Sequence, residues 1–155
     1  MNNHLLRTNL LESSMRPLLR PKRTKLTVRT GGHQFTIDEP PILARTNLGA
    51  SFVEHLLASL GSCQVITYQV WAAKLGIELK SVEVAVTGDL DVYGFFGLDP
   101  EVRPGFQSIG VKVRLNGPES SERYAALTKA VDEHCPVHAC PPSADFTAVS
   151  VTSGG

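Results

Sequence analysis

One long apolar segment, residues 51–75, constrains the possible folds of this chain more than any other feature. Ser51 and Glu54 have the spacing of a helix capping box, and Gly76 suits the position just after a helix C-terminus. The pattern therefore predicts a helix from Ser51 to about Leu75. Its apolar side chains lie on several sides, so we expect this helix inside the fold or against a partner chain.

Composition and charge exclude several classes of protein. The chain has 155 residues, 42% of them hydrophobic and 19% charged, which is typical of one domain with a core and not of a disordered protein. The formal net charge is zero, so the overall charge gives no electrostatic support for nucleic-acid binding. A membrane span needs about 20 nearly uninterrupted apolar residues. The long segment is interrupted by polar residues: Glu54, His55, Gln64, Gln69 and Lys74.

A β-hairpin is predicted before the helix. Segments 25–30 and 33–38 flank Gly31-Gly32, a two-residue turn that favours a hairpin. In that register Val28 lies opposite Phe35, and both belong to one apolar face.

The second half of the chain predicts three strands and one helix. Residues 81–90 and 109–115 alternate apolar and polar side chains, as half-buried strands do. A helix is expected over 120–134, and a short closing strand over 146–152. The stretch 91–107, rich in glycine, proline and aromatic residues, is interpreted as a loop that folds over something apolar. We expect mainly antiparallel neighbours and an α+β fold class.

Two of the three cysteines stand at positions that suggest redox chemistry. Cys63 lies inside the long helix, and Cys135 lies just after the second helix, where Pro136 disfavours further helix. Few cysteines and no secretory signal favour a reducing, cytoplasmic location, where disulfides tend to be transient and catalytic. If the two thiols meet in the fold, they can form a reversible disulfide. The alternatives are a buried core thiol for Cys63 and a loop residue without chemical role for Cys135.

Peroxide reduction suits such a thiol pair. A thiolate attacks the O–O bond and becomes a sulfenic acid, which a second thiol converts to a disulfide. An arginine can stabilise the thiolate, and a carboxylate can hold the arginine. The candidates are Arg29 and Glu54. Glu54 is also explained as a capping-box residue, and Arg29 as a solvated strand residue.

Several motifs together resemble the OsmC/Ohr family, over about residues 25–151. The segment from Glu54 to Cys63 resembles the family's first-cysteine helix, and Cys135-Pro136-Val137-His138 its second-cysteine motif. The middle region is similar in Gly88-Asp89-Leu90-Asp91, in Gly94-Phe95-Phe96-Gly97-Leu98 and in Arg103-Pro104-Gly105-Phe106.

This resemblance implies an OsmC-like fold, with antiparallel sheets around two central helices in an intertwined homodimer whose active sites lie at the subunit interface. It also implies thiol-dependent reduction of organic hydroperoxides and, in some branches, of hydrogen peroxide. Cys63 would be the peroxidatic cysteine and Cys135 the resolving one, with no cofactor or metal. The reductant in the best-known branch is a dithiol, a lipoylated protein.

Two positions depart from the organic-hydroperoxide branch. In that branch the acidic residue lies ten positions before the first cysteine. This chain has Val53 at that position, and its acidic residue, Glu54, lies nine positions before Cys63. The arginine of that branch follows the Gly-Gly turn, where this chain has His33. Arg29 precedes the turn, and Arg45 is a further candidate.

Two other functions remain open at the level of sequence. His134, Cys135, His138 and Cys140 form a dense thiol–imidazole cluster that could hold a metal, although its spacing is not that of a zinc finger. Cys140 could also compete with Cys135 for disulfide formation. Alternatively, the aromatic loop 93–106 beside the long helix could bind an apolar ligand without catalysis.

The first 24 residues form a separate basic segment. Residues 1–25 contain six lysines or arginines and one acid, Glu12. We interpret residues 1–24 as a basic extension to a single OsmC-like domain over 25–155. A transit peptide, or a true start at Met15, are the alternatives.

Overall fold

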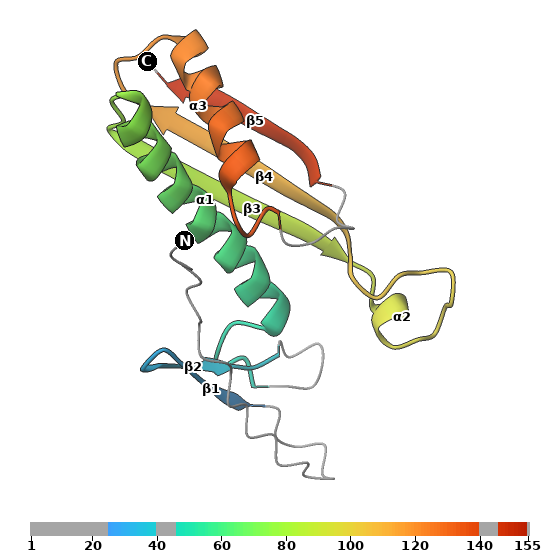
Figure 1. The fold of residues 1–155 in the computed structure, drawn as a ribbon. Helices are drawn as coiled ribbons and strands as arrows, with labels where there is room; N and C mark the ends of the chain where they lie inside the picture. Colours follow the sequence, from blue (N-terminus) through green and yellow to red (C-terminus); the bar gives the residue numbers. More distant parts are fainter. Residues whose placement is uncertain (1–24, 40–45, 140–145, 155) are drawn as a thin grey trace, which may run out of the picture. The chain divides into compact units, whose positions relative to one another are not determined.

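The computed structural model describes residues 25–39, 46–139 and 146–154 (Figure 1). It divides into two compact units, Met1–His55 and Leu56–Gly155. The predicted extension 1–24, with Met15, lies outside the described residues.

The first unit contains the predicted hairpin. Strands β1 (Leu26–Thr30) and β2 (His33–Ile37) pair antiparallel, with Val28 opposite Phe35. Gly31 and Gly32 form the turn with φ of 54° and 82°, a backbone region that glycine enters without strain. The hairpin and its register were therefore predicted correctly.

Asp38 connects the end of this hairpin to the segment that follows it. Its buried carboxylate accepts hydrogen bonds from the Thr46 hydroxyl, from the N–H of Leu48 at 3.1 Å and from the N–H of Glu39 at 2.9 Å. The bonds from Thr46 and then Leu48 hold the pKa of Asp38 below its ordinary value.

The long helix α1 runs over Phe52–Leu75, as predicted. Its N-terminus is a reciprocal capping box, because the Glu54 carboxylate accepts from the Ser51 N–H at 2.7 Å and the Ser51 hydroxyl accepts from the Glu54 N–H at 3.3 Å. Gly76 follows the helix with φ of 62° and ends it. Among the described residues, no helix is long and apolar enough to cross a membrane.

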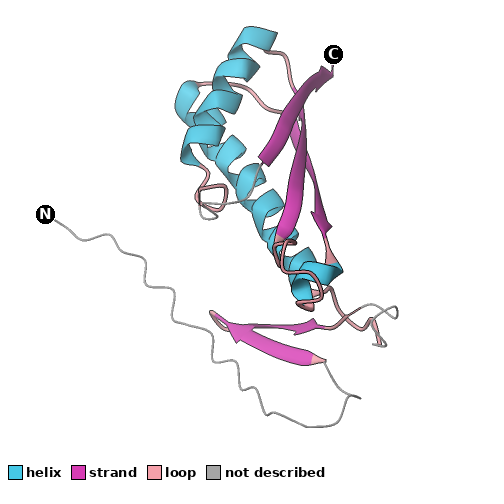
Figure 2. Ribbon diagram, turned by 90° about the vertical axis from the view of Figure 1, so that its right-hand side faces the viewer, coloured by secondary structure: helices cyan, strands magenta, loops and turns pink. Residues whose placement is uncertain are grey.

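A three-stranded sheet, most of α1 and two further helices make up the second unit. Strands β3 (Ser81–Leu90) and β4 (Phe106–Asn116) pair antiparallel, with Val84 opposite Val113. Helix α3 (Ser121–His134) follows β4 and begins at the N-cap Ser120. In this unit α1 and α3 cover one face of the sheet (Figure 2).

The last strand departs from the expected antiparallel arrangement. Strand β5 (Phe146–Gly154) is longer than predicted and pairs with β4 in parallel. The reason is topological: α3 carries the chain back across the sheet before β5 begins, and such a crossover connects parallel strands. The fold class remains α+β, with antiparallel pairing at β1–β2 and β3–β4.

The loop between β3 and β4 differs from its interpretation. It includes a short helix, α2 (Val92–Phe95), whose N-cap Asp91 accepts from the Tyr93 N–H at 2.8 Å. Large apolar side chains on and after this helix are exposed: Val92, Tyr93, Phe95, Phe96 and Leu98. Among the described residues of this stretch, Phe106, which begins β4, packs against the core. The large apolar side chains of α2 and of the residues after it thus keep much of their surface exposed in the single chain.

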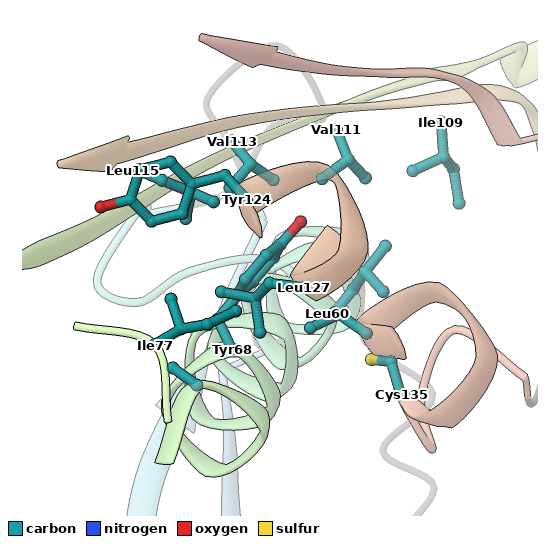
Figure 3. Packing of buried hydrophobic residues seen from close by; sticks show 12 residues of the cluster. Leu60, Tyr68, Ile77, Ile109, Val111, Val113, Leu115, Tyr124, Leu127 and Cys135 are labelled. Atoms are coloured by element: carbon teal, nitrogen blue, oxygen red, sulfur yellow. The ribbon is translucent and has the colours of Figure 1, made fainter. Parts of the chain in front are cut away.

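The core lies between the two helices and the sheet (Figure 3). Side chains on α1 and α3 meet a row of inward-facing residues on β4. The buried members include Leu60, Tyr68, Val111, Val113, Leu115, Tyr124, Leu127, Val131 and Cys135. The resolving-cysteine candidate is thus part of the core itself.

Candidate active site

The structure brings Cys63 and Cys135 together. Their sulfur atoms lie 3.5 Å apart although 72 residues separate them in the chain, and the Cys135 thiol donates to the Cys63 sulfur. Both are free thiols. Cys135 is only 1% exposed, whereas Cys63 is half-buried. The two sulfurs are thus in contact but differ in their access to solvent.

The end of α3 places Cys135 inside the protein. Leu127 and Val131 of α3 are fully buried and hold the helix against the core. Cys135 is the C-cap residue, its N–H bonded to the Val131 carbonyl at 2.8 Å, and Pro136 prevents the helix from continuing. The side chain therefore leaves the helix beside α1, close to Leu60 in the core (Figure 3).

The surroundings of Cys135 act on its pKa in opposite directions. Burial raises the pKa of the thiol, and contact with Cys63 raises it further. The backbone N–H of His138 and the side chain of Thr67 lower it, because both donate hydrogen bonds to the thiolate form. Burial is the largest of these effects, so the Cys135 thiol holds its proton in the resting protein.

Two neighbours of Cys63 on α1 were not recognised from sequence. Thr67 is 7% exposed, and its hydroxyl donates to the Cys63 carbonyl at 2.7 Å. Gln64 is fully buried, and neither polar atom of its amide has a hydrogen-bond partner in the described part of the chain. The helical spacing of Thr67, four residues after Cys63, was the signal available for it.

Arg29 and Glu54 both belong to the first unit, and each has a partner there. Arg29 is exposed, and its Nε donates to Oε1 of Gln34 across the hairpin at 2.9 Å. The carboxylate of Glu54 is bonded to Ser51, which lowers the pKa of Glu54. The capping role predicted for Glu54 is confirmed, and its role in activating Cys63, like that of Arg29, stays a prediction. Arg45 lies outside the described residues.

The described residues give no support for the alternative of a metal site. The Nδ1 of His134 donates to the Ala130 carbonyl at 2.8 Å, and its ring lies 4.2 Å from that of Trp71. No group of three or more His, Cys, Asp or Glu side chains is placed to hold a metal in residues 25–39 and 46–139. Cys140 lies outside these ranges.

Comparison with known proteins identifies the family. The family model described as OsmC-like protein matches residues 45–143, which is more than half of the chain. The chain belongs to the OsmC-like protein family. Because the motifs around Cys63 and Cys135 lie within the matched residues, the resemblance seen in the sequence is confirmed.

Solved structures of OsmC-like proteins have the same fold. An OsmC-like protein from Mycoplasma pneumoniae is 20% identical with a TM-score of 0.71, the alignment covering 83% of this chain and 88% of that one. An organic hydroperoxide resistance protein OsmC from Legionella pneumophila is 19% identical, with a TM-score of 0.67 and coverage of 95% and 98%. The organic hydroperoxide resistance protein OhrB of Bacillus subtilis is 21% identical, with a TM-score of 0.53 and coverage of 84% and 89%. No curated protein sequence gives a match.

Proposed function

We propose that this OsmC-like protein is a thiol peroxidase that reduces organic hydroperoxides through Cys63 and Cys135. The observation that carries the proposal is the 3.5 Å contact between two free sulfurs of unequal exposure. Similarity to structures of organic hydroperoxide resistance proteins supports the substrate class. Hydrogen peroxide is a second substrate of the same chemistry.

The reaction proceeds in two steps at the thiol pair. The Cys63 thiolate attacks one oxygen of the hydroperoxide, the O–O bond breaks, and the alkoxide leaves and takes up a proton as alcohol. Cys63 is now a sulfenic acid. The Cys135 thiol loses its proton and attacks that sulfur, and the hydroxide that leaves becomes water with this proton. Two thiols and one hydroperoxide thus give one disulfide, one alcohol and one water.

The unequal burial supports this assignment of roles. A hydroperoxide reaches the half-buried Cys63 more readily than Cys135, which is 1% exposed. Burial also keeps Cys135 protonated, as expected of a thiol that waits for the sulfenic acid and does not meet the peroxide first. Arg29 and Glu54 are proposed to complete the site by orienting the peroxide and the thiolate.

A dithiol reductant then reopens the disulfide by thiol–disulfide exchange, and a lipoylated protein is the proposed partner. We also propose a cytoplasmic homodimer. Large apolar side chains of α1 support the dimer, because Leu56, Ile66 and Val70 are 52%, 60% and 57% exposed in the single chain.

The test mixes the reduced protein with cumene hydroperoxide and follows free thiols and peroxide consumption. We use a Cys140→Ser background, so that only the two proposed thiols are counted. The parent should lose both thiols per peroxide consumed. Cys63→Ser should abolish consumption. Cys135→Ser should permit one turnover and then further oxidation of Cys63. If the parent keeps both thiols, the peroxidase proposal is wrong.

A second candidate, a non-enzymatic binder of apolar ligands, is favoured by the exposed side chains on and after α2, among them Tyr93, Phe95 and Leu98. A fatty acid or aromatic ligand should then raise the melting temperature of the wild type and of Cys63→Ser equally. Thiols inert to peroxide together with such a shift would favour binding over catalysis.

A further inference from the structure

Thr67 lies on α1, one turn after the cysteine whose sulfur contacts Cys135 at the end of α3. It is one helical turn after Cys63, with its hydroxyl 2.7 Å from the Cys63 carbonyl oxygen. The same side chain also lies near enough to Cys135 to lower the pKa of its thiol, because the hydroxyl can donate to the thiolate form. Because Thr67 is only 7% exposed, water has little access to this hydroxyl as an alternative partner.

The hydroxyl has one proton and two groups that can receive it. In the resting protein the proton goes to the Cys63 carbonyl, while the Cys135 thiol donates to Cys63. When Cys135 loses its proton, its sulfur becomes the stronger acceptor, since hydrogen bonds to charged groups exceed those to neutral ones. Rotation about one bond of Thr67 moves the donor from the carbonyl to the thiolate. The carbonyl keeps the backbone bond that it accepts within the helix.

We propose that Thr67 is a positioning residue for the second step, and that its hydroxyl holds the Cys135 thiolate against Cys63 while the disulfide forms. This inference deepens the proposed peroxidase function and rests on it. Valine has the same branched shape without the hydroxyl, so the need for a side chain of this shape does not by itself explain a hydroxyl at this position.

The charged groups around Cys135 do not supply this stabilisation. Within residues 25–39 and 46–139, the titratable side chains found to act on Cys135 or to be acted on by it are Cys63 and Tyr68, both on α1. A thiol and a phenol add no positive charge. In the described part of the chain, the groups that can donate to the thiolate are therefore the backbone N–H of His138 and the hydroxyl of Thr67.

The first experiment measures the ionisation of Cys135 without any peroxide. In a Cys63→Ser, Cys140→Ser background Cys135 is the sole cysteine, and the carbon NMR shift of its labelled Cβ follows the thiolate without interference from tyrosines. Thr67→Val should raise the pKa of Cys135 by about one unit, the size expected for one hydrogen bond to a charged group. Thr67→Ser should restore the parent value.

Thr128→Val is the matched control. Thr128 is a half-buried helical threonine whose hydroxyl donates to the carbonyl four residues earlier, at 3.0 Å, as Thr67 does. Its replacement also removes the 3.4 Å bond from the Tyr68 phenol. Burial raises the pKa of Tyr68, so this phenol stays neutral while Cys135 titrates, and the pKa of Cys135 should be unchanged. If Thr67→Val does not fold, Thr67→Ala takes its place. An unchanged pKa in the hydroxyl-free variant, or Thr67→Ser behaving like Thr67→Val, would overturn the inference.

The second experiment follows the reaction by stopped flow in the protein with Cys63 and Cys135 intact. Thr67→Val should form the Cys63 sulfenic acid at the parent rate but close the disulfide about threefold more slowly at neutral pH. The thiolate fraction falls about tenfold, and the higher pKa makes the remaining thiolate about threefold more nucleophilic. Equal rates of closure would contradict the role of Thr67. A parent that forms no disulfide would contradict the peroxidase proposal, while the NMR titration would still decide whether Thr67 stabilises the Cys135 thiolate.

Discussion

Oxidation of the thiol pair should stabilise the folded protein. A Cys63–Cys135 disulfide would close a loop of 72 residues, and the reduced sulfurs already lie 3.5 Å apart. The chain-entropy model assigns about 4 kcal/mol to a loop of this length, because the cross-link restricts the unfolded chain. For a protein of this size each kcal/mol corresponds to about 2–4 °C, so the melting temperature should rise by about 8–16 °C.

The assay compares thermal unfolding of the reduced protein with that of protein oxidised by one equivalent of cumene hydroperoxide. Protein concentration is held constant, since dimerisation would also change stability. Cys135→Ser, treated identically, should show no rise. Mass spectrometry must first establish the Cys63–Cys135 link. If the link is present and the melting temperature rises by less than about 2 °C, the entropic reasoning fails.

Four further substitutions test the fold that supports the site. Leu127→Ala removes a fully buried side chain and should cost about 3 kcal/mol, measured as a lower urea midpoint with an unchanged slope. Tyr124→Phe should cost about 1–2 kcal/mol in the same assay, because the Glu78 carbonyl loses its bond to the phenol. Gly117→Ala places a methyl group against that phenol and should also lower the midpoint, by about 1–3 kcal/mol. Glu54→Gln should lower the melting temperature at neutral pH. Since folding lowers the pKa of Glu54, this difference should shrink as the pH falls below about 4.5.

Local patterns predicted most of the elements because the deciding residues are close in sequence. Gly31-Gly32 sets the register of the hairpin, and Ser51 with Glu54 sets the start of α1. The parallel pairing of β5 was not predicted, since it depends on how α3 crosses the sheet and not on the residues of the strand.

The candidate site could be predicted only in part, because its geometry depends on contacts between residues that are far apart in the sequence. The cysteines could be paired through motifs, but their contact and their unequal burial are properties of the packed core. Gln64 was interpreted as a polar interruption of the helix, yet it is fully buried. A role for Thr67 could be inferred only after the structure showed the end of α3 near this residue.

The unequal exposure of the two sulfurs also determines which sulfur of the oxidised protein a reductant would attack. An incoming dithiol can touch only the outer sulfur of a Cys63–Cys135 bridge, so the mixed disulfide would form at Cys63 and Cys135 would depart as the leaving group. The rate at which the disulfide is reduced would then depend on how well the protein interior stabilises the Cys135 thiolate as it leaves. A reductant that needs the inner sulfur would find no approach to it.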